Sequence, residues 1–182
     1  MKYEVIDNFL DEEYFKTLEV IFTDAEGEGS RLPWFFVKDI VYHKENENWK
    51  SGEEDDKVFF MFNMVYYENC IISNVYKTLI PLINKLNANL CLLRIKSNLY
   101  PNTHKLHEHQ FHTDFDFPHS GAILSLNTCD GYTKLKDGTK IDSVANRILL
   151  FDSSEEHCST STTNVPARFN ININYIQTKM RF

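Results

Sequence analysis

The pattern of apolar and polar positions divides the chain into two parts near residue 89. Before this point, two segments show the spacing of helices that bury one stripe. The first helix follows Asp11, which we predict to be its N-cap, and the second covers residues 70–86, where Pro81 predicts a kink or a split. The stripe of the first helix consists of Phe15, Leu18, Ile21 and Phe22. The other predicted elements here are strands at 3–6, 34–42 and 58–67 and loops at 25–30 and 43–57.

After residue 89, short segments of alternating polarity predict strands that are separated by turns. The clearest is 168–175, in which apolar side chains alternate with Arg168 and three asparagines. The other predicted strands are 91–100, 109–116, 122–127, 131–135, 139–141 and 147–152. This number of strands is typical of a mainly β jelly roll with supporting α-helices packed outside. We therefore expect a single domain over 1–182, with helices and outer strands in 1–88 supporting a barrel core in 89–176.

Composition limits the class of protein further. Of the 182 residues, 42% are apolar and 14% aromatic, as expected for a folded globular chain. The formal net charge of −7 argues against binding to a nucleic-acid backbone, which needs clustered lysine and arginine. Four scattered cysteines predict reduced thiols. Because we find neither a signal-peptide core nor a membrane-spanning run, we expect a soluble cytoplasmic protein without a membrane partner, and the oligomeric state stays open.

His112 and Asp114 form the most informative pair of polar residues. If residues 109–116 are a strand, the two side chains point the same way, because successive residues alternate between faces. His157, which follows the predicted strand 147–152, adds a second imidazole. Two histidines and one carboxylate can hold one face of an octahedral Fe(II) and leave the other coordination positions open. We therefore predict a metal site at these three residues, and expect no catalytic residues beyond the metal ligands.

Other histidines and acids compete for this role. His107 and His109 lie on the opposite strand face by parity, unless a bulge intervenes, and His104 falls in a predicted loop. Asp116 shares the face of Asp114, but residues two apart reach one point more readily than residues four apart. Taken alone, each of these histidines, His157 included, is more often a surface or hydrogen-bonded residue.

Arg168 begins the alternating strand 168–175 on its polar side. That side faces either water or the cavity of a small barrel, where a planar guanidinium would suit a carboxylate and hold a dicarboxylate better than lysine. Tyr100 is either a core aromatic or a hydroxyl that shares the same carboxylate. Further candidate hydrogen-bond donors to the cavity are Asn127, Asn170 and Asn172.

These residues together resemble the Fe(II)/2-oxoglutarate-dependent oxygenase superfamily and, within it, the prolyl-hydroxylase-like branch. The resemblance covers residues 90–176 in unbroken order. The start, residues 5–10 followed by a helix, is similar to short stand-alone members, including those encoded by bacteriophages. The matching segments are 99–102, 112–114, 123–127, 147–151, His157 and 167–171. Ser125 stands where animal prolyl hydroxylases of this branch have tyrosine, and the stretch from His157 to Arg168 is longer than theirs.

The resemblance implies a double-stranded β-helix, which is the cupin-like form of the jelly roll. It implies Fe(II) held by His112, Asp114 and His157, and 2-oxoglutarate whose far carboxylate pairs with Arg168 and Tyr100, with Asn127 and Asn172 as further contacts. O2 is then the oxidant, ascorbate a candidate reductant, and succinate and CO2 the products of a hydroxylase. The substrate would be a peptide or protein, with peptidyl proline as one candidate, or a small molecule. A phage-encoded member would work in the host cytoplasm.

Two other classes of protein remain open. One is a non-catalytic, cupin-like domain that binds a metal or ligand in the same barrel. The other is a zinc-dependent hydrolase, which needs a general base and leaves Arg168 without a role. The polar composition of 43–57 also suggests a lid over the mouth of the barrel, as a hypothesis.

Overall fold

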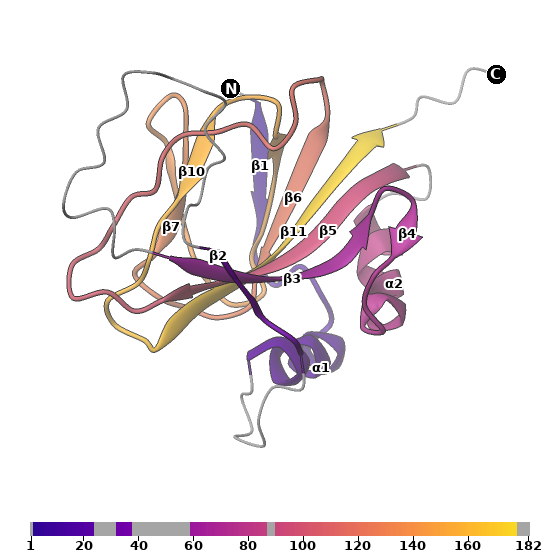
Figure 1. Cartoon of the computed structure of the whole chain (residues 1–182), viewed down its shortest axis with the longest axis horizontal. Helices are drawn as coiled ribbons and strands as arrows, with labels where there is room; N and C mark the ends of the chain where they lie inside the picture. Colours follow the sequence, from indigo (N-terminus) through magenta and orange to yellow (C-terminus); the bar gives the residue numbers. More distant parts are fainter. Residues whose placement is uncertain (1, 24–31, 38–58, 87–89, 178–182) are drawn as a thin grey trace.

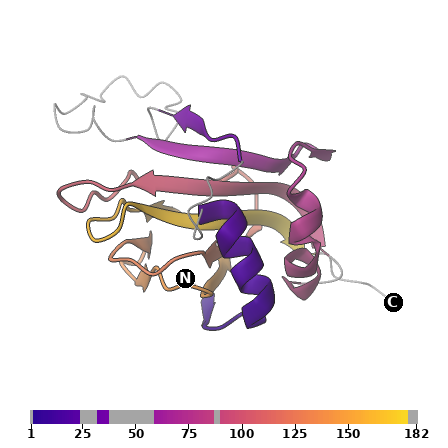
Figure 2. The same ribbon diagram turned by 90° about the horizontal axis from the view of Figure 1, so that it is seen from below.

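A computed structural model describes residues 2–23, 32–37, 59–86 and 90–177. Within these residues, two antiparallel β-sheets form a jelly roll, and helices α1 and α2 lie along one side of the larger sheet (Figures 1 and 2). The predicted fold class is thereby confirmed. The predicted loops 25–30 and 43–57, the latter with its lid hypothesis, lie outside the described residues.

The larger sheet has the strand order β1-β9-β6-β11-β5-β3-β2, and β4 pairs with β3. Its strands are β1 (Tyr3–Ile6), β2 (Phe35–Val37), β3 (Phe60–Tyr67), β4 (Cys70–Ile71), β5 (Leu90–Pro101), β6 (Ser120–Ser125), β9 (Ile148–Asp152) and β11 (Ala167–Gln177). β11 lies at the centre, between β5 and β6. The predicted strands of this sheet are confirmed with small shifts at their ends, except that residues 38–42 and 58 are not described.

The smaller sheet has the order β10-β7-β8, and its strands are β7 (Tyr132–Leu135), β8 (Lys140–Asp142) and β10 (His157–Ser159). The strand predicted at 109–116 is wrong. This segment is a loop, and its β-pairing is limited to isolated bridges at and next to it, from Glu108 to Thr160 and from His112 to His157. Between these bridges the loop takes one residue more than its partner, as in a β-bulge, and the extra residue interrupts continuous pairing.

Helix α1 (Glu12–Thr23) begins where the sequence predicts. Oδ1 of Asp11 accepts the backbone N–H groups of Glu13 and Tyr14 at 3.1 and 3.3 Å, which confirms the N-cap. Helix α2 (Tyr76–Leu86) begins later than predicted, because Cys70–Ile71 turns back to pair with β3 instead. Glu68 and Asn69 make this tight turn with φ of 50° and 61°. Within the described residues, neither helix is long and apolar enough to cross a membrane.

Pro81 does not split α2, and a side chain from α1 supplies hydrogen bonds to the backbone groups around it. The hydroxyl of Tyr14 donates to the carbonyl of Thr78 at 2.7 Å and accepts the N–H of Leu82 at 3.3 Å. The hydroxyl thus bridges two backbone groups that would otherwise bond each other directly in a regular helix.

Replacing Tyr14 with phenylalanine should therefore lower the free energy of unfolding by about 1–3 kcal/mol, because two backbone groups lose their partner. Urea denaturation followed by circular dichroism measures this change. Tyr3→Phe, at a side chain that is 43% exposed, is the matched control. A loss for Tyr14→Phe no larger than for the control would contradict the bridging role.

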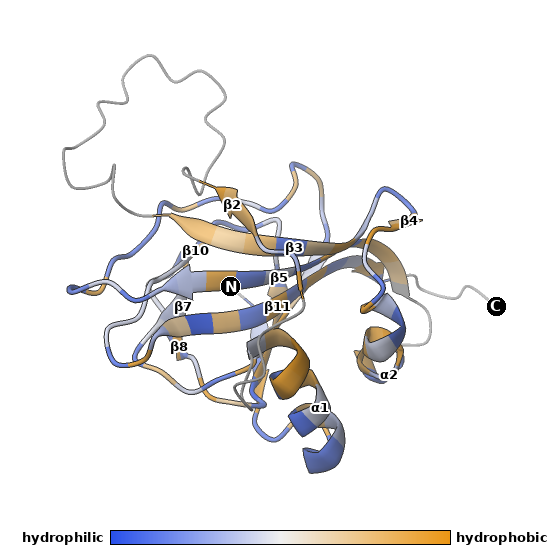
Figure 3. Cartoon of the chain, turned by 60° about the horizontal axis from the view of Figure 1, so that its bottom comes forward, coloured by the Kyte–Doolittle hydropathy of each residue, from blue (hydrophilic) through white to orange (hydrophobic). Residues whose placement is uncertain are grey.

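The two faces of the larger sheet differ in polarity. One face carries apolar side chains, including Ile95, Ile171 and Ile173, that pack against the helices. The other face looks toward the smaller sheet and, along β5 and β11, is polar. Figure 3 shows the alternation as hydrophilic and hydrophobic bands on both strands. Polar side chains of this inner face are Lys96, Asn98, Tyr100, Asn170 and Asn172.

Candidate metal centre

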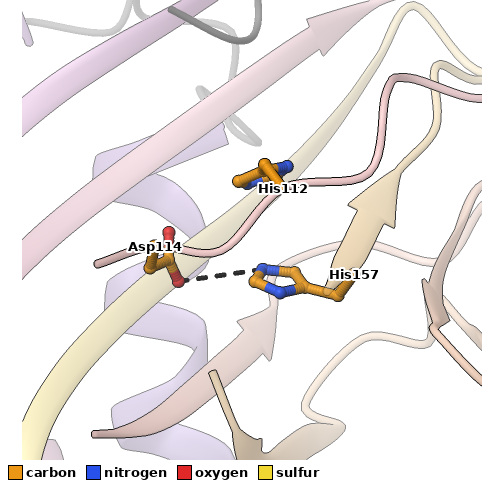
Figure 4. A group of neighbouring side chains, drawn as sticks. All are labelled: His112, Asp114 and His157. Carbon is orange, nitrogen blue, oxygen red and sulfur yellow. Dashed lines mark ion pairs between the residues drawn. The ribbon is translucent and has the colours of Figure 1, made fainter. Parts of the chain in front are cut away.

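His112, Asp114 and His157 meet between the two sheets (Figure 4). Each offers a ligand atom, and these atoms lie within 4.8 Å of one another. The backbone fixes this meeting: the N–H of His112 donates to the carbonyl of His157 at 2.9 Å, and the reverse bond is 3.0 Å. The loop before β6 and the first residue of β10, far apart in sequence, are thereby held with their imidazole centroids 4.7 Å apart. The structure brings together all three predicted ligands.

Both imidazoles are oriented by backbone carbonyls. Nδ1 of His112 lies 3.3 Å from the carbonyl oxygen of Gln110, and Nδ1 of His157 lies 3.1 Å from that of Glu155. Because a carbonyl only accepts, each Nδ1 carries the proton and each Nε2 is left with a lone pair for a metal. Burial lowers the pKa of His112 to about 4 and also lowers the pKa of His157. Both rings are therefore neutral at pH 7, the form that binds metals.

Asp114 is the acidic member of the group, and its side chain is 3% exposed. Arg94 donates from Nη2 to its Oδ1, while Ser153 Oγ and Asn174 Nδ2 donate to its Oδ2 at 2.5 and 2.8 Å. Burial raises the pKa of Asp114, but the positive charge of Arg94 and of other neighbours lowers it more, so it lies well below the ordinary value. Asp114 is thus a carboxylate held in one orientation.

Arg94 is not among the candidate ligands, but we expect it to matter for metal binding because it orients the carboxylate of Asp114, which is one of them. We expect Arg94→Met to weaken Fe(II) binding by about 10- to 100-fold, as other partners of metal ligands do. Anaerobic titration with Fe(II) measures this affinity, with exposed Lys105→Met as the control. An affinity equal to that of the control variant would show that Arg94 has no part in the site.

The competing ligands lie elsewhere. Asp116 is exposed, and it is not among the described residues whose ligand atoms cluster. His109 is buried, but its ring packs on Tyr100 at 5.3 Å between centroids and its Nδ1 lies 2.9 Å from Ser159 Oγ. His104 is exposed in the loop. Among the described residues, only the predicted triad forms a group suited to a metal.

A cavity extends from the triad between the polar faces of the sheets. It is lined by the three candidate ligands and also by Tyr100 and Thr133. Its volume is about 30 Å³, which is room for about one water molecule. A larger ligand therefore enters only when lining side chains change rotamer, and Lys96 is the longest of them.

Arg168 lies behind the Tyr100–Thr133 side of this cavity and is 1% exposed. Its Nη1 donates to the carbonyl of Thr160 at 3.2 Å and its Nη2 to Thr133 Oγ1 at 3.0 Å, while its Nε has no partner among the described residues. The guanidinium carbon lies 5.5 Å from the Tyr100 ring centroid. No acidic side chain of the described residues forms an ion pair with Arg168. A buried cation without an anion is costly, which points to an anionic ligand.

The other predicted contacts fall in different places. Tyr100 lines the cavity, and burial raises the pKa of its hydroxyl. Asn172 also lines the cavity and donates to both oxygens of Asp114 at 3.3 and 3.5 Å, and its own Oδ1 has no partner. Asn170 accepts from Asn98 at 2.8 Å. Asn127 is not brought to the cavity: it donates to Ala167 O at 2.8 Å and accepts from Phe169 N at 2.9 Å, so it fixes the start of β11.

Two cationic residues of β5 were missed by the sequence reasoning. Arg94 and Lys96 share the parity of Tyr100, so they face the same side of the strand. That parity is a signal in the sequence that would have found them. Ser153 and Asn174, which hold Asp114, carry a weaker signal: Asn174 shares the parity of Arg168, but Ser153 lies just past the end of β9.

No family model matches the chain, and no curated protein matches it. Solved structures do match. An oxidoreductase of the 2-oxoglutarate–Fe(II) oxygenase family from Burkholderia pseudomallei aligns with a TM-score of 0.64 and 8% identity, over 97% of this chain and 86% of that one. A viral collagen prolyl hydroxylase from Paramecium bursaria Chlorella virus 1, in its 2-oxoglutarate complex, aligns at 0.58 and 11%, over 98% and 97%.

A third match is a prolyl hydroxylase from Trichoplax adhaerens in complex with a peptide fragment of the hypoxia-inducible factor oxygen degradation domain. It aligns with a TM-score of 0.55 and 18% identity, over 96% of this chain and 83% of that one. These three structures do not test the predicted phage-type relationship, which stays a prediction. At such low identities the likeness establishes the fold: the chain has the jelly roll found in 2-oxoglutarate–Fe(II) oxygenases.

Proposed function

We propose that this protein is an Fe(II)- and 2-oxoglutarate-dependent oxygenase that hydroxylates a C–H bond of its substrate. The observation that carries the proposal is the placement of two kinds of group around one cavity. A two-histidine, one-carboxylate group lies at one place in its wall, and a buried guanidinium without an acidic partner lies behind another.

The donor set of the triad fits Fe(II). Two neutral imidazoles present Nε2 and one ionised carboxylate presents oxygen, which is the facial arrangement of non-haem Fe(II) oxygenases. Zinc accepts the same donors, but a hydrolase needs a separate general base. Asp114 is the only carboxylate among the described residues that line the cavity, and Arg168 would have no task there.

The far carboxylate of 2-oxoglutarate would lie on the Tyr100–Thr133 side of the cavity, after lining side chains have changed rotamer to admit it. Arg168 would pair with it through the unpartnered Nε and neighbouring N–H groups, and the protonated hydroxyl of Tyr100 could donate to it as well. Because the existing partners of Arg168 are neutral oxygens, a carboxylate would be a stronger acceptor than either of them. The match to a structure in complex with 2-oxoglutarate supports this assignment.

Bound Fe(II) and 2-oxoglutarate, together with O2, would supply an oxidant for C–H bonds and release succinate and CO2. The chain's own residues do the rest. His112 and His157 would hold one side of the metal by Nε2, and Arg94, Ser153 and Asn174 keep the Asp114 carboxylate facing it. Arg168 would orient the cosubstrate from its far end. The buried walls of the two sheets limit the access of water.

The substrate is proposed only as a class, a peptide or protein or a small molecule. The peptide bound to the matched Trichoplax enzyme supports a peptide, with an internal proline as one candidate. A non-catalytic, cupin-like binding domain remains the second candidate. It would use the same triad to hold a metal, but it would produce no succinate.

The function is tested with purified protein that is loaded under nitrogen with Fe(II), 2-oxoglutarate and ascorbate and then exposed to air. Succinate is the readout, first alone and then with a panel of proline-containing peptides. Formation of succinate only when both Fe(II) and 2-oxoglutarate are present supports the oxygenase. A protein that binds Fe(II) but forms no succinate under any of these conditions would favour the binding domain.

A further inference from the structure

Lys96 is a second cation of the cavity, and the proposed reaction does not use it. It lies on β5, between Met64 of β3 and Asn172 of β11, and it lines the cavity beside His112 and Asp114. Its ammonium stands over the ring of Phe60, 5.4 Å from the centroid. Among the described residues it has no hydrogen-bond or ion-pair partner within ordinary distance.

Asp114 does not neutralise Lys96. Its oxygens already accept from Arg94, Ser153, Asn174 and Asn172. Consistent with this, burial and the charge of Arg94 lower the pKa of Lys96 to about 8, against a smaller opposite influence of Asp114. An anion beside the ammonium would reverse that burial penalty.

The net charge of the whole site also favours an anion beside Lys96. Arg94, Lys96 and Arg168 place three positive charges in or behind the cavity wall, against the single carboxylate of Asp114. A divalent metal together with the dianion 2-oxoglutarate leaves that surplus unchanged. The two carboxylates of 2-oxoglutarate are also both occupied, one at the metal and one at Arg168. Lys96 is therefore left for a different ligand, and it lines the cavity together with His112 and Asp114.

We propose that Lys96 binds a carboxylate group of the substrate and so places the neighbouring carbon at the metal. This inference rests on the proposed function for the identity of the site, and it narrows the substrate to one that carries a carboxylate. An internal proline of a peptide has no charge of its own and would not satisfy Lys96. Phe60, under the ammonium, would form the apolar side of this subsite.

The test uses a minimal carboxylate and its neutral counterpart, ¹³C-acetate and ¹³C-acetamide. The protein is loaded with Mn(II), whose unpaired electrons speed the relaxation of nearby carbon nuclei, and measured with and without saturating 2-oxoglutarate. In wild type we expect the relaxation enhancement caused by Mn(II) to be about tenfold larger for acetate than for acetamide. An ion pair at a buried site should raise the affinity for acetate by at least this factor. Lys96→Met should lose the difference, whereas Lys96→Arg and exposed Lys105→Met should keep it.

Several outcomes would overturn the inference. Acetate and acetamide could relax alike in wild type, or Lys96→Met could keep the preference for acetate. A third is a loss of 2-oxoglutarate affinity in Lys96→Met as large as the loss of the acetate response, which would assign Lys96 to the cosubstrate. Calorimetric binding of 2-oxoglutarate to the wild type tests the proposed function separately: if it fails while the acetate response depends on Lys96, the proposed function is wrong and the anion subsite stands.

Discussion

Asp114→Ala is expected to abolish Fe(II) binding and, with it, all formation of succinate. The substitution removes the only carboxylate of the triad and leaves two imidazoles, which cannot hold a facial site on their own. Asp116→Ala is the matched control, since this acid lies two residues further on, is exposed, and takes no part in the cluster. Metal content after anaerobic loading and gel filtration measures the effect directly.

The folded state of the Asp114 variant needs its own check, because Arg94 loses its partner in the interior. Asp114→Asn keeps the shape and most of the hydrogen-bond partners, and we expect it to fold and still lose Fe(II) affinity by about 100-fold or more, since a neutral amide is a poor metal ligand. Retained iron in a folded Asp114→Asn or Asp114→Ala protein would show that Asp114 is not a ligand.

Arg168→Met is expected to raise the dissociation constant of 2-oxoglutarate on the order of 100-fold, because the loss of one partner of a buried charge pair costs several kcal/mol. Calorimetry on the protein loaded with Mn(II) measures it. Arg147→Met serves as the control, since Arg147 pairs with Asp7 at the surface. Fe(II) affinity should change little, because Arg168 does not line the metal side of the cavity.

The same substitution should leave the ligand-free protein at least as stable as wild type. The guanidinium of Arg168 is buried with two neutral acceptors, and its own Nε has no partner among the described residues. Its charge therefore destabilises the folded protein when no anion is bound. Thermal unfolding without ligand measures this. A large loss of stability together with an unchanged affinity for 2-oxoglutarate would assign Arg168 a structural role and remove it from the proposed site.

The spacing of polar residues predicts much of this site. The pairing of His112 with Asp114 is correct although it assumes a strand at 109–116, which the structure does not contain. The alternation over 168–175 places Arg168 on the polar side of its strand, but leaves open whether that side faces water or the cavity. The position of His157 next to His112 is a different matter. It depends on backbone bonds between two segments far apart in sequence, and no local pattern encodes which segments will pair.

The misjudged elements have physical causes of the same kind. The segment 109–116 has the residues of a strand, but one extra residue between its bridges keeps it a loop. Residues 70–71 continue the helical spacing, but a turn at Glu68 and Asn69 directs them back along β3, with which they pair as a strand. Pro81 predicts a kink or a split of α2, which is not split, and the Tyr14 hydroxyl, from another helix, bridges the backbone groups of Thr78 and Leu82 on either side of it. In each of these, tertiary contacts override a local preference.

Diffraction at the iron absorption edge, from crystals grown under nitrogen with Fe(II) and 2-oxoglutarate, tests the central claim most directly. We predict one anomalous peak, bonded by Nε2 of His112, Nε2 of His157 and a carboxylate oxygen of Asp114, with 2-oxoglutarate reaching from it to Arg168. An anomalous peak bonded by other residues, or 2-oxoglutarate bound away from both the peak and Arg168, would contradict it.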